Sequence, residues 1–251
     1  MTTITNQSNT HLTTQLDKVT SSQQKISSGF KINAAKDDAA GLQLSNRLLS
    51  QLNNLDNQAR NTNDVISYYQ VAQSGFSGLT EVAGRINELS IAAGNGSLDA
   101  AGRAAIAQEI SGLGEQISLI SAQTTFGGQP IFSSDSQLVG NLGFDPSAQN
   151  FTNSDLSTVS GAQSVIMQSE QYLTNLNSAS ATVGALQQQQ LSDLSVQSSQ
   201  KIANSTSLSA IKDTDFAAQI SEYLKNKMQV EAAISLKAQA NLTSDVVKHL
   251  L

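Results

Sequence analysis

A helical pattern of apolar residues runs from residue 39 to residue 93 without a proline, and it restricts the possible folds more than any other feature. Apolar side chains recur at steps of three or four residues, the spacing of one face of an α-helix. With one irregular step near Tyr69, the positions are Leu48, Leu52, Leu55, Ala59, Ile66, Tyr69, Ala72, Phe76, Leu79, Ala83 and Ile86. Such a helix would be about 80 Å long at about 1.5 Å per residue. Few compact domains need that length, so the pattern predicts a mainly α, elongated antiparallel helical bundle or coiled coil.

Two further helices are predicted on either side of the long one. The first runs roughly from Thr3 to Ser28 and carries a heptad-like seam, with Leu12, Leu16, Val19, Gln23, Ile26 and Phe30 at its positions. Gly29 and Asn33 are residues typical of turns and helix ends. After a break at Gly94 to Ser97, regular 4-3-4-3 spacing from Ile106 to Ile120 predicts a third helix that returns antiparallel to the second.

The second half of the chain begins with a polar stretch. Residues 133–160 are rich in Ser, Asn, Asp and Gly, and their short apolar pieces predict a small β-hairpin near 131–160 with loops around it. Helical spacing resumes at about Ala162 and continues to Ile202. A last helix is predicted to begin after about Ser209, with Asp213 and Asp215 at its positive N-terminal end.

The last predicted helix is apolar over more than one face. Its apolar residues are Phe216, Ile220, Tyr223, Leu224, Met228, Val230, Ile234 and Leu236. A helix of this kind is either buried on several sides or binds a partner. The two chain ends are therefore predicted to be the parts that depend most on partners.

Composition excludes several classes of protein. The formal net charge of −6 disfavours nucleic-acid binding, because phosphates are neutralised by clustered Lys and Arg. No run of about 18 apolar residues occurs, so no membrane insertion is predicted. The first residues lack the basic and apolar regions of a Sec signal peptide. The chain has no cysteine, which removes disulfide and thiolate chemistry.

Catalytic and metal-binding chemistry has little support in the sequence. His11 and His249 lie in opposite terminal segments and are interpreted as isolated surface histidines; a metal or base role would require the chain ends to meet. Asp37 and Asp38 could form a general acid–base pair by composition. Next to Lys36 and at a helix start, they are better explained by helix capping and by salt bridges between subunits. We predict no enzyme activity, no cofactor and no metal site.

The segment ISSGFKINAAKDDAAGLQLS, Ile26 to Ser45, resembles the N-terminal signature of bacterial flagellins. Residues 57–96 and 105–132 are similar to the long helix and the returning helix of that family. The C-terminal signature is matched by Gly184 to Gln187 and by Ile211 to Ala217, IKDTDFA. The resemblance covers nearly the whole chain except 133–160, where flagellins usually carry large variable outer domains. The chain is therefore identified as a short flagellin that lacks those domains.

The resemblance implies a division of the chain and a set of site residues. Residues 1–38 would pair with residues 211–251 as an inner coiled coil, and residues 39–210 would form a middle helical bundle. The residues implied in filament assembly or at the junction between these parts are Asp37, Asp38, Gly41, Asp213, Asp215 and Phe216. The match to the flagellin motif implies that the surface bound by the vertebrate innate flagellin receptor would include Arg85, Leu89 and Glu109.

The resemblance also implies a function and partners. The chain would be exported by the flagellar type III route without signal cleavage and would polymerise outside the cell into a flagellar filament for motility. An export chaperone would cover the C-terminal helix, and filament cap and hook-junction proteins would contact the filament ends. A hook–filament junction protein is the nearest alternative, and a secreted rod-like adhesin is a second. The small centre leaves little room for the recognition domain of an adhesin.

Overall fold

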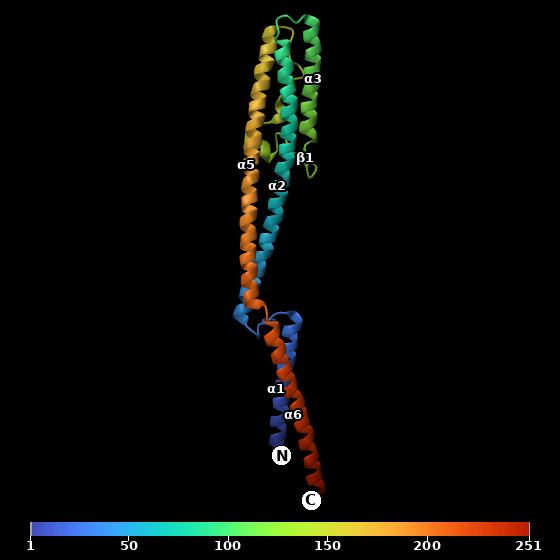
Figure 1. The fold of residues 1–251 in the computed structure, drawn as a ribbon, viewed down its shortest axis with the longest axis vertical. Coiled ribbons are helices and arrows are strands. Elements are labelled where there is room, and N and C mark those ends of the chain that lie inside the picture. The colour runs from blue at the N-terminus through green and yellow to red at the C-terminus, as the bar shows by residue number, and fades with distance from the viewer. Residues whose placement is uncertain (1, 251) are drawn as a thin grey trace. The chain divides into compact units, whose positions relative to one another are not determined.

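The computed structural model describes the backbone of residues 2–250 and the side chains of residues 9–239. The side chain of His249 lies outside the described residues, so its predicted role as a surface residue stays a prediction. Helices dominate the chain (Figure 1). The elements are α1 Thr2–Ser28, α2 Ala39–Ala93, α3 Ala100–Gln123, β1 Thr125–Phe126, β2 Gln129–Pro130, α4 Gln137–Leu142, the 3₁₀ helix η1 Pro146–Ala148, α5 Val159–Lys212 and α6 Phe216–Leu250.

The chain forms two compact units. Unit 1 consists of residues 1–56 with 199–251, and unit 2 consists of residues 57–198. Helices α2 and α5 contribute residues to both units. The domain boundaries expected at 38/39 and 210/211 stay a prediction.

The predicted helix ends agree closely with the structure for α1 and α2, because strong local signals mark them. Gly29 ends α1 with a φ of +73°, a conformation that suits a residue without Cβ. Asp38 caps the start of α2, where its Oδ1 accepts the N–H of Gly41 at 2.9 Å. Asp99 caps α3 by accepting the N–H of Gly102 at 2.7 Å. Signals of this kind explain why the ends of α1 and α2 can be read from the sequence.

The last helix begins later than predicted. Helix α5 continues without a break to Lys212, and α6 begins at Phe216. Asp215 caps α6, since its Oδ1 accepts the N–H groups of Ala217 and Ala218. Of the two carboxylates expected at this helix start, Asp215 is there, whereas Asp213 lies just beyond the end of α5.

The core of unit 2 lies among three long helices, which Figure 1 shows side by side. Asn87 of α2 donates to the hydroxyl of Ser169 of α5 at 2.9 Å. Arg103 of α3 donates to the carbonyls of Ala93 and Asn95, which holds the turn between α2 and α3. Although aromatic residues make up only 4% of the chain, four of them are fully buried here: Phe76, Phe132, Phe151 and Tyr172. The aromatic side chains are thus concentrated where one compact core needs volume.

A small antiparallel hairpin is present, but its predicted position near 131–160 is wrong. Strands β1 and β2 pair Thr125 with Pro130 and Phe126 with Gln129. Gly127 and Gly128 link them with φ values of +59° and +81°, which is the backbone that a two-residue hairpin turn requires. The apolar piece at 137–142 forms helix α4 instead, capped by Ser136 and ended by Gly143 at φ +62°. A short apolar run fits a strand or a helical turn equally well, and the caps decide in favour of the helix.

Residues 145–157, which we call the strap, contain a five-residue repeat. In each repeat an Asp or Asn Oδ1 accepts both the backbone N–H and the hydroxyl of the residue two positions later. The apolar residue between them is buried in every case. The three motifs are Asp145-Pro146-Ser147, Asn150-Phe151-Thr152 and Asp155-Leu156-Ser157. Each turn therefore directs one apolar side chain into the core of unit 2.

Side chains of the neighbouring helices hold the strap. The Tyr172 hydroxyl of α5 donates to the carbonyl of Pro146 at 3.0 Å, and burial raises the pKa of this phenol. The Ser111 hydroxyl of α3 donates to the carbonyl of Thr152 at 3.1 Å. The buried carbonyls of the strap thus find partners that an isolated loop would not offer.

Candidate functional site

In unit 1 the two linkers between helices lie side by side and form a short backbone pairing, which we call the clasp. Phe30, just after α1, pairs antiparallel with Asp213, just after α5. The N–H of Lys31 donates to the carbonyl of Lys212 at 2.7 Å, and the N–H of Thr214 donates to the carbonyl of Gly29 at 3.0 Å. Residues almost two hundred positions apart are therefore joined where both helices are interrupted.

Two lysines reinforce the clasp. Nζ of Lys31 donates to the carbonyl of Ala210 at 2.9 Å, near the C-terminal end of α5, where carbonyls carry partial negative charge. Nζ of Lys212 lies 4.3 Å from the centre of the Phe30 ring, a cation–π contact worth about 0.5–1 kcal/mol at an exposed site. Asp213 also accepts a hydrogen bond from the hydroxyl of Ser209. Of the predicted site residues, Asp213 therefore belongs to the clasp.

The neighbouring carboxylates Asp37 and Asp38 have different roles. Asp38 caps α2, so the predicted capping is confirmed for this residue. Oδ2 of Asp37 accepts the N–H groups of Asn33 and Ala34, both at 3.0 Å, and closes the turn before α2. These backbone hydrogen bonds, chiefly that from Asn33, hold the pKa of the Asp37 carboxyl below its usual value. Each carboxylate is therefore already engaged within its own chain.

A groove of about 640 Å³ lies over this turn. Asp37, Asp38 and Gly41 line one side, and Ala210 and Ile211 of α5 line the other. The structure thus brings three of the predicted assembly residues together on one surface. Asp215 and Phe216 lie instead at the start of α6, where Phe216 is half exposed.

Gly41 leaves little room for a larger residue. A Cβ at this position would lie 2.7 Å from Cδ1 of the buried Ile32 and would overlap the carboxylate of Asp38. We expect Gly41→Ala to destabilise unit 1 by about 1–3 kcal/mol, through a weakened cap and overpacking. Thermal unfolding followed by circular dichroism would measure this loss.

A matched control for that change is Gly84→Ala, in the interior of α2. A Cβ at Gly84 meets no atom within 4 Å. This substitution should leave stability unchanged or raise it by about 0.5–1 kcal/mol, because alanine favours the helix. If both variants unfolded at the same temperature, the close packing described at Gly41 would be contradicted.

Helices α1 and α6 pack side by side and antiparallel (Figure 1). Nδ2 of Asn226 lies 3.5 Å from the hydroxyl of Ser22, and Nζ of Lys237 donates to Oδ1 of Asn9 at 2.6 Å. We call the buried and half-buried residues that recur at steps of three and four the seam. On α1 the seam comprises Leu12, Gln15, Val19, Ser22 and Ile26, and on α6 it comprises Gln219, Tyr223, Asn226, Val230, Ala233 and Lys237.

The seam differs from the one predicted for α1. Leu16 is 46% exposed and Gln23 is also exposed, whereas their predecessors Gln15 and Ser22 are buried. On α6 the buried polar residues are Gln219 and Asn226. The pair therefore buries polar side chains at positions where a stable two-helix coil has apolar ones.

One buried group in the seam has no partner among the described residues, the Oε1 atom of Gln15. Leaving such an oxygen unsatisfied costs about 1–3 kcal/mol. The polar seam and this orphaned oxygen both weaken the contact between α1 and α6 within one chain.

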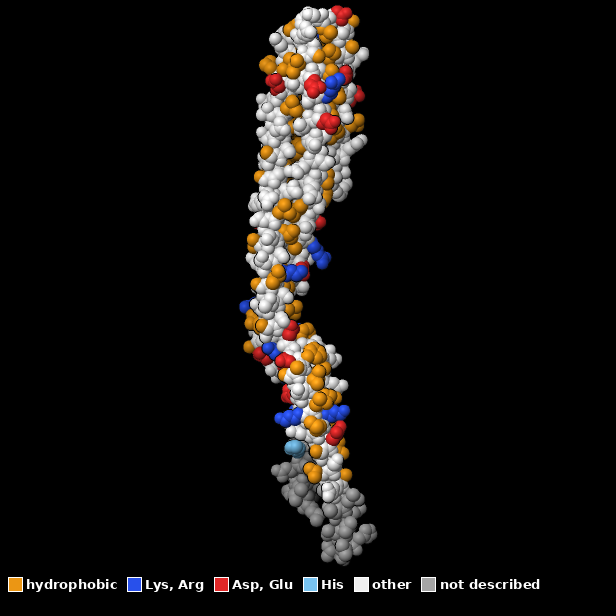
Figure 2. Space-filling view, viewed as in Figure 1, with side chains coloured by type: hydrophobic (Ala, Val, Ile, Leu, Met, Phe, Trp, Pro, Cys, Tyr) orange, Lys and Arg blue, Asp and Glu red, His pale blue; other side chains and the backbone are white. Residues whose placement is uncertain are grey.

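Helix α6 carries an exposed row of apolar side chains at steps of four residues, Phe216, Ile220, Leu224 and Met228, which we call the apolar stripe. These side chains are 44–63% exposed. Hydrophobic side chains gather along this part of the chain in Figure 2. Helix α6 is therefore not buried on several sides within the described residues, and the prediction that it binds a partner stays a prediction. The surface remains uncovered by the described part of the chain.

The residues predicted to face an innate receptor lie on unit 2. Arg85 forms exposed ion pairs with Glu88 and, across to α3, with Glu109 at 3.1 Å. Leu89 is only 7% exposed and belongs to the core. Arg85 and Glu109 are therefore the accessible members of this set, and the receptor surface stays a prediction.

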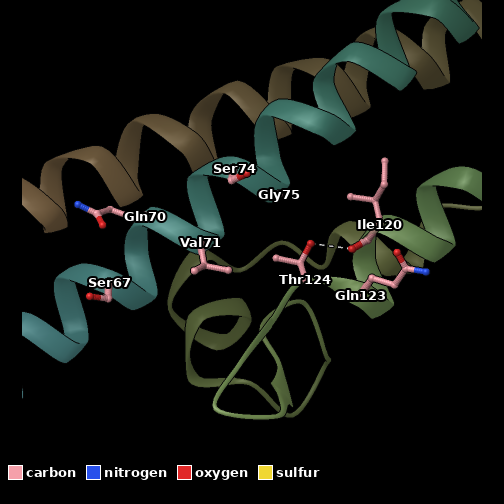
Figure 3. Close-up of a pocket in the computed structure, with 8 residues that line it drawn as sticks. All are labelled: Ser67, Gln70, Val71, Ser74, Gly75, Ile120, Gln123 and Thr124. Carbon is pink, nitrogen blue, oxygen red and sulfur yellow. Dashed lines mark hydrogen bonds between the residues drawn. The ribbon is translucent and has the colours of Figure 1, made fainter.

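A second groove, of about 540 Å³, runs between α2 and the end of α3 in unit 2 (Figure 3). Its lining offers hydroxyl, amide and aliphatic groups and no ionisable side chain: Ser67, Gln70, Val71, Ser74, Gly75, Ile120, Gln123 and Thr124. The Thr124 hydroxyl already donates to the carbonyl of Ile120 at 2.7 Å. This groove can form hydrogen bonds and apolar contacts, but it offers no acid or base.

The described residues also bear on metal sites and on membrane-spanning helices. Within these residues, no group of three or more His, Cys, Asp or Glu side chains is placed to hold a metal ion. Among the described helices, none combines the length and the apolar character needed to cross a membrane.

Fold and site together define a mainly α protein whose two chain ends pair antiparallel and leave an apolar stripe exposed. Residues 2–137 match the bacterial flagellin N-terminal helical region, and residues 166–251 match the bacterial flagellin C-terminal helical region. The chain therefore belongs to the bacterial flagellin family. Only residues 138–165 separate the two matched regions, so the chain lacks a large variable domain between them.

Similar proteins include flagellins of three Vibrio species. Polar flagellin F of Vibrio parahaemolyticus is 42% identical over 123 residues, 49% of this chain and 33% of that protein. Flagellin D of Vibrio anguillarum is 45% identical over 112 residues, 45% of this chain and 30% of that protein. Flagellin B of Vibrio cholerae is 41% identical over 117 residues, 47% of this chain and 31% of that protein. The chain spans about a third of the length of the curated relatives it matches.

A solved structure is also similar in part. The crystal structure of Bacillus cereus flagellin gives a TM-score of 0.46 at 18% identity and covers 55% of this chain and 88% of that chain. The family assignment rests on the two matched regions and not on this partial likeness.

Proposed function

We propose that this chain is a structural subunit that assembles with copies of itself into a bacterial flagellar filament and thereby serves motility. The observation that carries the proposal is the apolar stripe of α6, which one copy of the chain leaves uncovered. Membership in the flagellin family supports a second copy as the occupant. Burial of apolar surface is the main driving force of such association.

The polar seam supports the same proposal. Helices α1 and α6 bury Gln15, Ser22, Gln219 and Asn226 against each other and expose the apolar stripe. The pair therefore leaves apolar surface exposed that a neighbouring copy would bury. A contact that uses different surfaces on the two copies, and that does not close, generates a helical filament rather than a ring.

The assembly interface is proposed to include the turn before α2 and the start of α6. Asp37, Asp38 and Gly41 line the 640 Å³ groove beside the clasp, and Phe216 begins the apolar stripe. Because Asp37 and Asp38 already accept backbone hydrogen bonds, their remaining lone pairs would form the proposed intersubunit salt bridges. Asp213 and Asp215 act through the clasp and the cap of α6.

Other partners are proposed from the family. An export chaperone would cover the apolar stripe before assembly, and cap and hook-junction proteins would contact the filament ends. Export by the flagellar type III route would place the chain outside the cell. Arg85 and Glu109 would form the accessible part of an innate-receptor surface. We propose no enzymatic role, since flagellins are structural proteins.

Electron microscopy of the purified full-length chain after seeding tests the proposal. Filaments of micrometre length are the expected result. Short rings would favour a hook–filament junction protein, and monomers alone would favour the adhesin alternative; either result would contradict the filament proposal.

Deletion of residues 209–251 tests the role of the terminal pair. It removes all of α6, and with it the stripe and the partner of α1. We expect a soluble chain that retains the thermal transition of unit 2 and forms no filaments under seeding. Filaments of the truncated chain would rule out the proposed role of α6.

A further inference from the structure

We propose that Met228 is a site of reversible oxidation that controls assembly. The inference rests on the proposed function, because it concerns the surface through which copies of the chain would associate. A peroxide transfers one oxygen atom to the thioether sulfur, which becomes a sulfoxide, while the peroxide is reduced to water or an alcohol. No proton is left over, and the sulfur loses two electrons.

Because Met228 lies on the apolar stripe, its oxidation would affect the contact between copies of the chain. Its side chain is 63% exposed, so a peroxide can reach the sulfur in the unassembled chain. Leu224 and Ala232 lie four residues before and after it, and the charged Lys225 and Glu231 lie three residues before and after it. When a second copy covers the stripe, the sulfur of Met228 enters an apolar contact.

Oxidation changes what that contact must accommodate. A thioether is apolar and adaptable, whereas a sulfoxide carries a strong dipole with an oxygen that accepts hydrogen bonds from water. Covering the stripe would strip water from this oxygen, and the apolar side chains of the stripe itself offer no donor in return. Oxidised chains therefore stay unassembled until a sulfoxide reductase restores the thioether.

Met167 is a built-in control. It is 64% exposed, almost the same as Met228, and it lies on α5 in unit 2. Its neighbours one turn away are polar and exposed: Gln163, Ser164, Glu170 and Gln171. The two methionines should therefore react with peroxide at similar rates, but only Met228 belongs to the apolar stripe.

The test combines oxidation, mass spectrometry and seeded assembly of the full-length chain. Hydrogen peroxide is added to wild type, Met228→Leu and Met167→Leu, and peptide mass spectrometry records the sulfoxide at each position. We expect peroxide to raise the critical concentration of wild type and of Met167→Leu about tenfold, because the sulfoxide dipole loses its hydration when the contact forms. Met228→Leu should assemble before and after peroxide alike, and methionine sulfoxide reductase should restore oxidised wild type.

Met1 is present in all three proteins, so resistance of Met228→Leu also excludes an effect of that residue. In finished filaments, we expect Met228 to be oxidised at least several-fold more slowly than in the free chain. An equal loss of assembly in Met228→Leu, normal assembly of oxidised wild type, or unprotected Met228 in filaments would each overturn the inference. Untreated wild type that forms no filaments would contradict the proposed function and this inference with it.

Discussion

Replacing Leu224 by Asp is expected to abolish filament formation at concentrations where wild type assembles fully. Leu224 is half exposed in the middle of the apolar stripe, so the free chain accepts a carboxylate there without strain. In an assembled contact the carboxylate would lose its water among apolar groups, at a cost of several kcal/mol. Since each 1.4 kcal/mol is about a factor of ten, the critical concentration should rise roughly 100-fold or more. Sedimentation of seeded samples measures it directly.

Gln229→Asp is the matched control for that prediction. It places the same charge on the same helix, on an exposed residue about 140° around α6 from Leu224. We expect its critical concentration to stay within a few-fold of wild type, and both variants to retain the thermal transition of unit 2. If Leu224→Asp assembled as well as Gln229→Asp, the apolar stripe would not be an assembly surface.

Replacing Phe151 by Ala should cause a large loss of stability in unit 2. Phe151 is fully buried, and its ring lies 5.7 Å from the ring of Tyr172, centre to centre. Gly114 packs so closely against the backbone at Phe151 that a Cβ there would lie 3.0–3.2 Å from the strap. Because removal of the buried ring leaves a cavity in the core, we expect a loss of about 3–5 kcal/mol. Calorimetry should show a transition lowered on the order of 10 °C.

Asn150→Ala is the comparison variant for Phe151→Ala, because it changes the strap without opening a cavity. It removes the Oδ1 that accepts the N–H and the hydroxyl of Thr152. We expect a loss of about 1 kcal/mol, the typical contribution of such a hydrogen bond. A larger effect from Asn150→Ala than from Phe151→Ala would mean that the turn, and not the buried ring, holds the strap in place.

The candidate site could be predicted in part. Asp38 and Asp215 are local capping residues, and the glycine and aspartates around them mark helix ends in the sequence. The clasp was not predicted, because it pairs Phe30 with Asp213 and no local pattern links residues so far apart. The strap repeat could have been found, since Asp or Asn followed two positions later by Ser or Thr recurs every five residues. The signal for this repeat is the fixed spacing of polar residue types, whereas the helices were found from the periodicity of apolar residues.

The seam shows why hydrophobicity alone selects the wrong residue at two positions of α1. Leu16 and Gln15 are adjacent in sequence and both fit a three-and-four spacing with Leu12 and Val19. Apolar character favours Leu16 for the inside, yet the structure buries Gln15 and exposes Leu16. A polar spacing on α6, from Gln219 through Asn226, was the signal that could have identified the buried face.

Local signals predict the extents of α1 and α2, the presence of α3 and the mainly α class, and the motifs indicate membership in the flagellin family. These features depend on caps, glycines and periodicities that act over a few residues, or on motifs that can be read directly. The folded chain was needed to show which faces of α1 and α6 meet, where the hairpin and the strap lie, and how the clasp joins the two linkers. Those choices depend on contacts between distant residues, where several arrangements have similar local energies and packing selects one of them.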